Sequence, residues 1–174
     1  IVSVAQNTPA QCIVYCTPTG GASSTTYYLN NITTNAAWTN INYTANTYTA
    51  YVNSNMTATT SPGNNVNISL ASSGGSTYYY RVWVDWNNDS VFTNAAPELV
   101  LSNASYAATL AGTIPVPATT ALGNYRVRTS SSFSGVVTPC GPAPYGNYVD
   151  FTLSVVTPPS CMPPTAVTLV NTAA

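Results

Sequence analysis

The chain contains no lysine and no histidine, and only seven of its 174 residues carry a formal charge: three arginines and four acids. Charged residues therefore make up 4% of the chain, against about 25% in an ordinary soluble domain. Binding to nucleic acid or to an anionic membrane surface requires clustered basic side chains, so these partners are excluded. Without imidazole there is no histidine base and no histidine-ligated metal, which excludes triad hydrolases and zinc hydrolases.

Long apolar runs are absent as well, because no stretch of the sequence approaches the about 18 apolar residues of a membrane-spanning helix. Hydrophobic residues nevertheless reach 45% of the chain, which is too many for a segment that stays disordered. Asn, Ser and Thr replace the missing charges and supply 64 residues. We therefore expect a polar, uncharged chain with an apolar core and the length of a single domain.

The four cysteines lie in two pairs near the ends of the chain, Cys12 with Cys16 and Cys140 with Cys161. A zinc knuckle needs two closely spaced pairs, and the second pair is too widely separated to serve as one. An even number of cysteines in a chain without lysine favours two disulfides formed in an oxidising compartment. Three pairings are possible, and the spacing alone does not choose among them.

Apolar and polar residues alternate along much of the chain, as in half-buried strands. Val66, Ile68 and Leu70 alternate with polar neighbours, and residues 78–85 place aromatic and aliphatic side chains on both faces. No long window shows helical periodicity, and 13 prolines and 10 glycines interrupt the chain. Further strand candidates are residues 98–101, 113–116, 125–129 and 149–155. The pattern predicts an all-β fold, a single antiparallel β-sandwich of immunoglobulin-like or jelly-roll-like kind.

The two ends of the chain resemble each other, since residues 1–12 and 153–161 each contain a hydrophobic segment, then proline, then cysteine. Chance recurrence in a chain rich in valine and proline is one explanation. The other is a repeat of about 150 residues, as in tandem surface arrays. In that case residues 1–14 are a strand and linker from a preceding module. Residues 157–174 are then a proline-rich linker and terminal strand toward a next module or subunit.

Three of the four acids fall within residues 85–98, in a pattern that suits a metal. Asp85, Asn87 and Asp89 stand at alternate positions, which places three side-chain oxygens on one side of a tight loop. The carbonyl of Val91 and the carboxylate of Glu98 can complete the oxygen ligands that Ca2+ prefers. We predict a Ca2+ loop between two strands, with a solvated acidic turn as the alternative.

Two features separate this segment from an EF-hand. Ser90 stands where the sharp turn of an EF-hand has glycine, and the last acid comes two positions later. Asp85 and Glu98 could also be interpreted as a carboxylate pair for glycoside hydrolysis. The alternate spacing of the oxygen-bearing residues favours metal ligands instead, so we expect no enzymatic activity.

Six short blocks occur in a characteristic order along the chain: Tyr15–Pro18, Tyr80–Phe92, Glu98–Val100, Arg126–Arg128, Pro139–Gly141 and Tyr145–Thr152. Together they resemble the GEVED domain, a module of secreted and cell-surface proteins of Bacteroidota, over about residues 15–156. The motif that names the family, Gly-Glu-Val-Glu-Asp, reads Gly146-Asn-Tyr-Val-Asp150 here. Both glutamates are missing, so no role of theirs carries over to this chain.

The resemblance implies a β-sandwich module of a large extracellular protein, beside adhesin-like or fibronectin-type repeats, with no catalytic function. It also makes Cys16 with Cys140 the preferred disulfide. Cys12 and Cys161 would then clasp the ends of the module, in competition with a bond between modules. Arg126 and Arg128 share one strand face upstream of Asp150, and structural ion pairs are favoured over an anion site.

Taken with the composition, these features predict a non-enzymatic structural or adhesion module of the cell surface, either a calcium-stabilised repeat or a filament protomer. Its expected partners are neighbouring modules or identical subunits. The alternative function is a carbohydrate-binding module that binds surface glycans, because the chain has three Trp and 13 Tyr. That function predicts an exposed row of Trp and Tyr side chains at sugar spacing on one sheet face.

Overall fold

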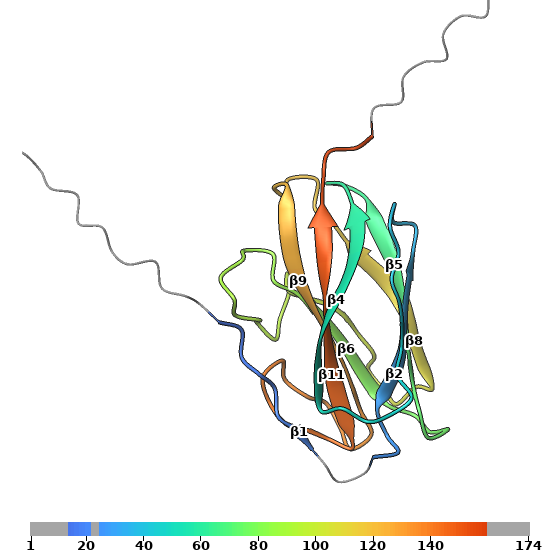
Figure 1. Ribbon diagram of the computed structural model, residues 1–174. Coiled ribbons are helices and arrows are strands. Elements are labelled where there is room, and N and C mark those ends of the chain that lie inside the picture. Colours follow the sequence, from blue (N-terminus) through green and yellow to red (C-terminus); the bar gives the residue numbers. More distant parts are fainter. Residues whose placement is uncertain (1–13, 22–24, 160–174) are drawn as a thin grey trace, which may run out of the picture.

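The structure of the chain is a computed structural model that describes residues 14–21 and 25–159 (Figure 1). These residues form strands and no helix, as the alternation predicted. None of them belongs to a helix that could span a membrane. The predictions for Cys12, for Cys161 and for the terminal segments before residue 14 and after residue 159 lie outside the described residues.

Two sheets pack face to face, which confirms the predicted β-sandwich (Figure 1). The larger sheet has the strand order β10-β1-β11-β9-β6-β7, with β4 also paired to β11, and the smaller sheet has the order β3-β2-β5-β8. The strands of the larger sheet are β1 (Gly20–Gly21), β4 (Tyr51–Thr60), β6 (Tyr79–Val84), β7 (Leu99–Ser102), β9 (Gly123–Ser132), β10 (Ala143–Pro144) and β11 (Gly146–Val155). Those of the smaller sheet are β2 (Leu29–Asn35), β3 (Asn42–Thr44), β5 (Asn65–Ser72) and β8 (Thr109–Pro115).

Most neighbouring strands are antiparallel, as expected, but two pairs are parallel: β4 with β11 and β1 with β10. A parallel pair needs a long connection that returns the chain in its original direction. Strands β5 to β10 lie between β4 and β11 in the sequence and provide that connection. Local alternation carries no information on such a distant pairing, so the sequence did not predict it.

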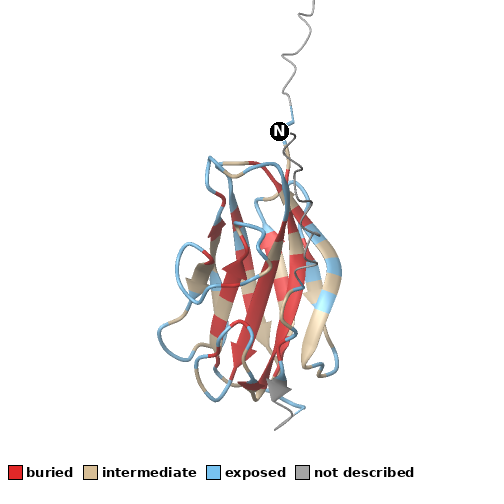
Figure 2. Cartoon of the chain, turned by 90° about the vertical axis from the view of Figure 1, so that its left-hand side faces the viewer, coloured by how far each residue is buried: buried red, intermediate tan, exposed pale blue. Residues whose placement is uncertain are grey.

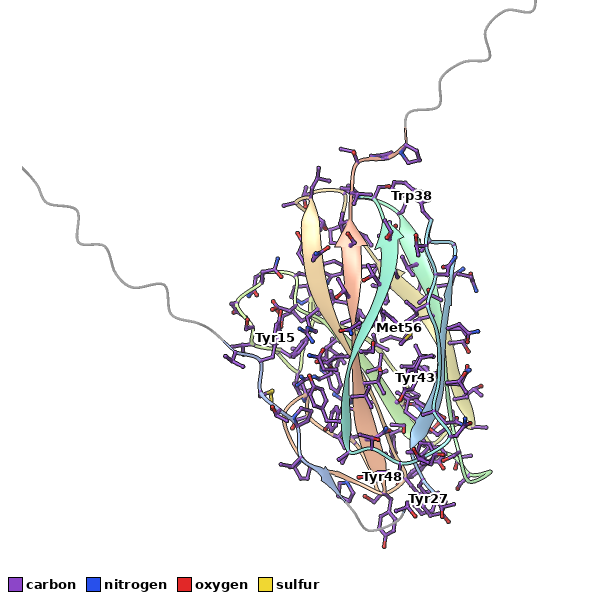
Figure 3. The ribbon with its side chains drawn as sticks, viewed as in Figure 1. Tyr15, Tyr27, Trp38, Tyr43, Tyr48 and Met56 are labelled. Atoms are coloured by element: carbon purple, nitrogen blue, oxygen red, sulfur yellow. A yellow bond between two sulfur atoms is a disulfide. The ribbon has the colours of Figure 1, made fainter. Side chains whose placement is uncertain are left out.

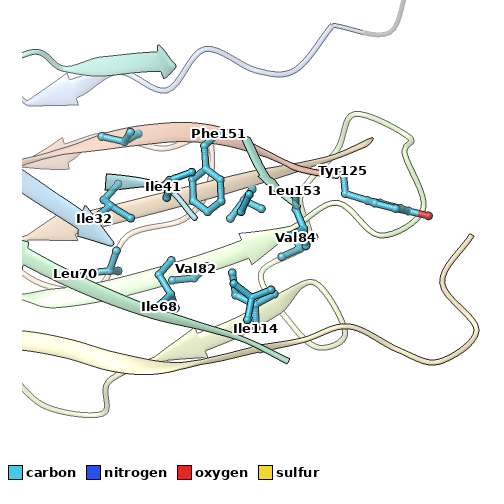
Figure 4. Packing of buried hydrophobic residues seen from close by; sticks show 14 of the residues in the cluster. Ile32, Ile41, Ile68, Leu70, Val82, Val84, Ile114, Tyr125, Phe151 and Leu153 are labelled. Carbon is cyan, nitrogen blue, oxygen red and sulfur yellow. The ribbon is translucent and has the colours of Figure 1, made fainter. Parts of the chain in front are cut away.

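The core between the sheets is formed by the residues whose alternation predicted the strands (Figure 4). On β5, Val66, Ile68 and Leu70 are buried and their polar neighbours point outward. On β6, β9 and β11 the inward positions carry valine, phenylalanine, tyrosine and leucine. Each fully buried aliphatic or phenylalanine side chain stabilises the fold by about 1.5–3 kcal/mol relative to exposure.

A second apolar cluster lies on the outer face of the larger sheet. Trp83 of β6 and Tyr148 of β11 point away from the main core, and they are covered by Phe92 and Val137 from two loops and by Ala143 of β10. Burial along the central strands is visible as red bands, interrupted by tan segments, in Figure 2. Strand β6 is therefore buried on both faces, and the residue that follows it, Asp85, begins its loop in an enclosed position.

Strands β2, β3 and β4 were not predicted from the sequence. In β2 the buried residues Leu29 and Ile32 are three apart, because a register shift against β5 between Leu29 and Asn31 interrupts the alternation. In β4 the buried positions are occupied by Ala58 and Thr60, which give no apolar signal. Strands β2 and β4 are stabilised by pairing with β5 and β11. A local sequence pattern contains no information on these pairings.

A disulfide joins Cys16 to Cys140, as the family resemblance implied. Their Cα atoms are 5.8 Å apart, within the usual range for this bond. The bond closes a sequence separation of 124 residues, which corresponds to about 4–5 kcal/mol in the chain-entropy model. It holds the segment before β1 against the loop before β10.

Candidate metal centre

Three carboxylates meet in the loop that connects β6 to β7. Asp85, Asp89 and Glu98 each offer one oxygen, and these oxygens lie within 4.8 Å of one another. Asp85 directly follows β6 and Glu98 directly precedes β7, and the N–H of Val84 donates to the carbonyl of Glu98 at 2.9 Å. Because the loop starts and ends on paired strands, two acids that are distant in sequence become neighbours.

Asp85 is fully buried, and its two carboxylate oxygens differ in their hydrogen bonds. Its Oδ2 accepts hydrogen bonds from the Tyr15 hydroxyl at 2.6 Å and from the Ser90 N–H at 2.9 Å. Its Oδ1 is buried and has no hydrogen-bond partner among the described residues. A buried carboxylate oxygen without a donor is costly, and a cation at this point would satisfy it.

Glu98 is the second buried carboxylate of the centre. Its Oε2 accepts hydrogen bonds from the N–H of Thr93 at 2.6 Å and from the Thr93 hydroxyl at 2.9 Å. These two bonds anchor the middle of the loop to its final residue, so the orientation of the carboxylate is set by the backbone around it.

Asp89 is exposed and closes the tight turn at the start of the loop. Its Oδ1 accepts the N–H of Val91 at 2.8 Å, and its Oδ2 accepts the side-chain amide of Asn87 at 3.0 Å. The side-chain oxygen of Asn87 in turn accepts the N–H of Asp89 at 3.0 Å. These mutual bonds are the local turns that Asn and Asp form with nearby backbone.

Ser90 has a φ of 65°, and Asn88 has a φ of 56°. This left-handed region favours glycine, and asparagine is among the residues that tolerate it. Ser90 therefore adopts the conformation that glycine provides in the sharp turn of an EF-hand. The departure from the glycine pattern leaves the sharp turn in place.

The structure thus gathers three of the five predicted ligands: Asp85, Asp89 and Glu98. Asn87 and Val91 lie on the same loop, and their hydrogen bonds with Asp89 use the Asn87 side chain and the Val91 N–H. Coordination by the Asn87 side-chain oxygen and the Val91 carbonyl stays a prediction.

The charge of the three carboxylates is not balanced by an arginine. Among the described residues the ion pairs of Arg126 and Arg128 both go to Asp150, and Arg81 donates to the side chain of Asn94 at 2.7 Å.

Tyr15 was not predicted as part of the centre, yet it lies against Asp85. Burial, reinforced by the hydrogen bond and the negative charge of Asp85, raises the pKa of Tyr15 well above its ordinary value. The hydroxyl therefore stays protonated and donates to the carboxylate. The guanidinium carbon of Arg126 lies 4.9 Å from the centroid of the Tyr15 ring, on which it stacks. No local sequence signal connects residues 70 positions apart.

A second charged group lies on the outer face of the larger sheet, where Arg128 and Asp150 are both fully buried. Arg128 Nε donates to Asp150 Oδ1 and Arg128 Nη2 to Asp150 Oδ2, each at 2.8 Å. Arg126 approaches Oδ2 at 3.7 Å, and the Tyr51 hydroxyl donates to the same oxygen at 2.9 Å. This confirms the structural ion pair favoured by the sequence.

The exposed aromatic side chains of the described residues do not form a row on a sheet face. They are Trp38, Tyr106 and Phe133, and all three lie outside the strands. Trp86, in the loop between β6 and β7, is half-buried with its ring 5.5 Å from that of Tyr125. The specific arrangement expected of a carbohydrate-binding sheet face is therefore not present.

Part of the chain matches a known protein family. Residues 79–154 match the model of the GEVED domain. No curated protein matches the chain. The matched segment runs from the start of β6 almost to the end of β11, so it includes the three carboxylates and the Arg128–Asp150 pair.

Proposed function

Since residues 79–154 form a GEVED domain within a β-sandwich, we propose that the chain is a non-enzymatic structural module of an extracellular protein. A Ca2+ ion held by Asp85, Asp89 and Glu98 fixes the loop between β6 and β7. The observation that carries this proposal is the buried Asp85 Oδ1, which has no donor among the described residues and lies in a cluster of unbalanced carboxylates.

The chemistry of the donor set favours calcium over other metals. The three ligand atoms are all carboxylate oxygens, which suit hard cations, and the cluster contains no thiolate or imidazole. Ca2+ accepts six to eight oxygen ligands in flexible geometry, whereas Mg2+ demands a nearly ideal octahedron. Asp89 is exposed, so carbonyl groups of the loop and water can complete the coordination.

Calcium would couple three parts of the fold. Asp85 follows β6, Glu98 precedes β7, and Tyr15 connects Asp85 to the disulfide-bonded N-terminal segment. An ion that binds only the folded chain stabilises it by about 2.7 kcal/mol when its concentration is a hundred times the Kd. In a domain of this size, that corresponds to a rise in Tm of about 5–10 °C.

The same geometry argues against hydrolysis. A glycoside hydrolase places its two carboxyl groups on either side of the scissile bond, at least about 5 Å apart. Here Asp85 and Glu98 are both buried, which keeps a polysaccharide chain from lying between them.

The distribution of charge supports a role as repeat or filament protomer whose partners are neighbouring modules or identical subunits. All seven charged residues lie on β6, β9 and β11 or in the loop from 85 to 98. The smaller sheet carries none, and outward positions such as Asn31, Thr33 and Asn67 are polar and neutral. Such faces can pack together without like-charge repulsion. The disulfide supports an oxidising location such as the cell surface. Electron microscopy of the native assembly tests this part of the proposal.

Thermal unfolding with calcium and with chelator tests the metal. We expect wild type to unfold about 5–10 °C higher with Ca2+. Asp85→Asn keeps an acceptor for Tyr15 and Ser90 but removes the charge, so it should abolish this difference. The matched control is Asn94→Ala in the same loop, which loses contacts to Arg81 and Trp83. It should lower both midpoints and keep the difference. Equal wild-type midpoints, or a calcium shift that survives in Asp85→Asn, would refute the calcium site.

A further inference from the structure

Five aromatic side chains gather at one end of the sandwich: Tyr27, Tyr79, Tyr106, Phe133 and Tyr145. We refer to them as the aromatic cluster. The rings of Tyr27 and Phe133 are stacked, with centroids 4.8 Å apart and planes at 9°. Tyr79 and Tyr106 are 4.3 Å apart, and Phe133 is 6.4 Å from Tyr106 and 6.2 Å from Tyr145. The cluster is thus continuous.

The fold brings these rings together from five separate places along the chain. Tyr27 precedes β2, Tyr79 begins β6, Tyr106 lies between β7 and β8, Phe133 follows β9, and Tyr145 lies between β10 and β11. Figure 3 shows Tyr27 at one end of the molecule and Trp38 at the other. The described chain ends on the Trp38 side (Figure 3), so the aromatic cluster lies opposite the point where the chain leaves the sandwich.

The backbone holds the cluster in place. The N–H of Phe133 donates to the carbonyl of Tyr145 at 3.0 Å, and the buried Tyr78 ring lies 6.2 Å from the Phe133 ring. A Cβ at Gly74 would lie 2.9 Å from Cδ1 of Tyr27, so glycine is needed for that ring to lie where it does. A surface whose rings are fixed in this way loses little conformational entropy on binding.

The cluster is accessible. The side chain of Tyr106 is 45% exposed and that of Phe133 is 37% exposed, and the other three rings are half-buried. The hydroxyls of Tyr79, Tyr106 and Tyr145 make no hydrogen bond to another described residue. The surface therefore combines apolar ring faces with polar groups at their edges.

The charge of this surface selects the class of ligand. None of the seven charged residues belongs to the cluster, and it contains no aliphatic side chain. The rings themselves offer no ion pair to an ionic ligand, whereas a neutral ligand matches their uncharged faces. A sugar ring has an apolar C–H face that stacks on aromatic rings and hydroxyls at its edge that exchange hydrogen bonds.

A pocket of about 320 Å³ lies beside the cluster, because residues that line it are sequence neighbours of two cluster residues. Ser132, Ser134 and Pro144 line the pocket, while the adjacent residues Phe133 and Tyr145 belong to the cluster. The hydroxyls of Ser132 and Ser134 both donate to the carbonyl of Pro144 at 3.1 Å. Ser132 is fully buried, but Ser134 is exposed and its oxygen remains available as an acceptor, so the pocket offers a hydrogen bond beside the rings. Its size lies within the range of small-molecule sites.

We propose that the aromatic cluster and this pocket form a binding site for a neutral polysaccharide. One sugar ring stacks on the exposed faces of Phe133 and Tyr106, and a neighbouring sugar places its hydroxyls in the pocket. The site shares no residue with the carboxylate centre, so it stands independently of the proposed calcium site.

Affinity electrophoresis of the full chain tests the site, in native gels that contain laminarin, xylan or galactomannan. We expect at least one of these neutral polysaccharides to retard the wild-type chain. Phe133→Ala and Tyr106→Ala should each weaken binding about tenfold, the loss of one ring contact. Trp38→Ala is the matched control, because Trp38 is 42% exposed at the opposite end and should not change binding.

The outcomes separate this proposal from its competitors. Tyr106→Ala removes the most exposed ring of the cluster, and an unchanged Tm establishes that its loss of retardation is not due to unfolding. Retardation should be the same with Ca2+ and with chelator at temperatures below both midpoints. No retardation in any of the three gels overturns the proposal, as does equal weakening by Trp38→Ala. Self-association that Phe133→Ala abolishes, without retardation, would assign the surface to a second copy of the chain instead.

Discussion

Replacing Arg128 by methionine tests how strongly the buried ion pair stabilises the sandwich. Methionine keeps much of the stem volume of arginine, and so the change removes the guanidinium and little else. Arg128 donates five hydrogen bonds: two to Asp150, one to the carbonyl of Pro139, and two to the carbonyl and sulfur of Cys16. Burial by itself lowers the pKa of Arg128. The hydrogen bonds and the negative charge of Asp150 raise this pKa by more than burial lowers it, so the net shift is upward.

The magnitude follows from what the substitution leaves behind. Asp150 Oδ1 loses the Arg128 Nε donor, while Oδ2 keeps the Tyr51 hydroxyl and the more distant Arg126. Removing one partner of a buried pair costs about 3–5 kcal/mol, because the other charge stays buried without compensation. In a domain of this size, each kcal/mol lowers Tm by about 2–4 °C, so we expect a decrease of about 6–20 °C.

Urea unfolding of three chains measures this effect: wild type, Arg128→Met, and the double variant Arg128→Met with Asp150→Asn. The double variant removes the uncompensated charge, so it should recover about 1–3 kcal/mol of the loss. A loss below about 1 kcal/mol in Arg128→Met would be that of an exposed pair and would refute the reasoning. So would a double variant that is no more stable than the single one.

Two further predictions concern close packing and alkaline pH. A Cβ at residue 146 would lie 1.9 Å from the carbonyl oxygen of Ser131. Gly146→Ala should therefore lower the free energy of unfolding by about 3 kcal/mol, measured by urea titration. Wild-type stability in this variant would contradict the close approach of β11 to β9 at this position. Burial, with the charges of Tyr80 and Tyr27, raises the pKa of Tyr78 from 10.0 to about 12. Because the folded state favours the neutral phenol, this contribution is complete below about pH 10 and is lost as the pH rises through about 12. Tyrosinate absorbance of Tyr78 that appears well before unfolding, measured as the difference from Tyr78→Phe, would contradict it.

The sequence predicted the strands whose inward positions carry strong apolar residues. Val149, Phe151 and Leu153 alternate along β11 and are buried, and β5, β6 and β9 follow the same rule. Strand β2 escaped prediction because a register shift places Leu29 and Ile32 three residues apart. The parallel pairing of β4 with β11 depends on the order of the whole chain, which no local window contains.

The candidate centre was predictable where its residues are close in sequence. Asp85, Asp89 and Glu98 were identified from spacing and from the scarcity of acids elsewhere, and the structure brings them together. Tyr15 was missed because its contact with Asp85 is created by packing of the N-terminal segment across the sheet. The aromatic cluster was missed for the same reason, since its five rings come from five different places along the chain.

The disulfide between Cys16 and Cys140 also determines how the molecule responds to tension. A pull applied at Tyr15 and Pro159 passes from Cys16 directly to Cys140 and then along β11, while residues 17–139 stay outside the loaded path. Strand β11 is already extended, at about 3.3 Å per residue, and has little slack to release. The sandwich therefore acts as a link of nearly constant length, in which the smaller sheet and most of the larger one carry none of the load along the chain.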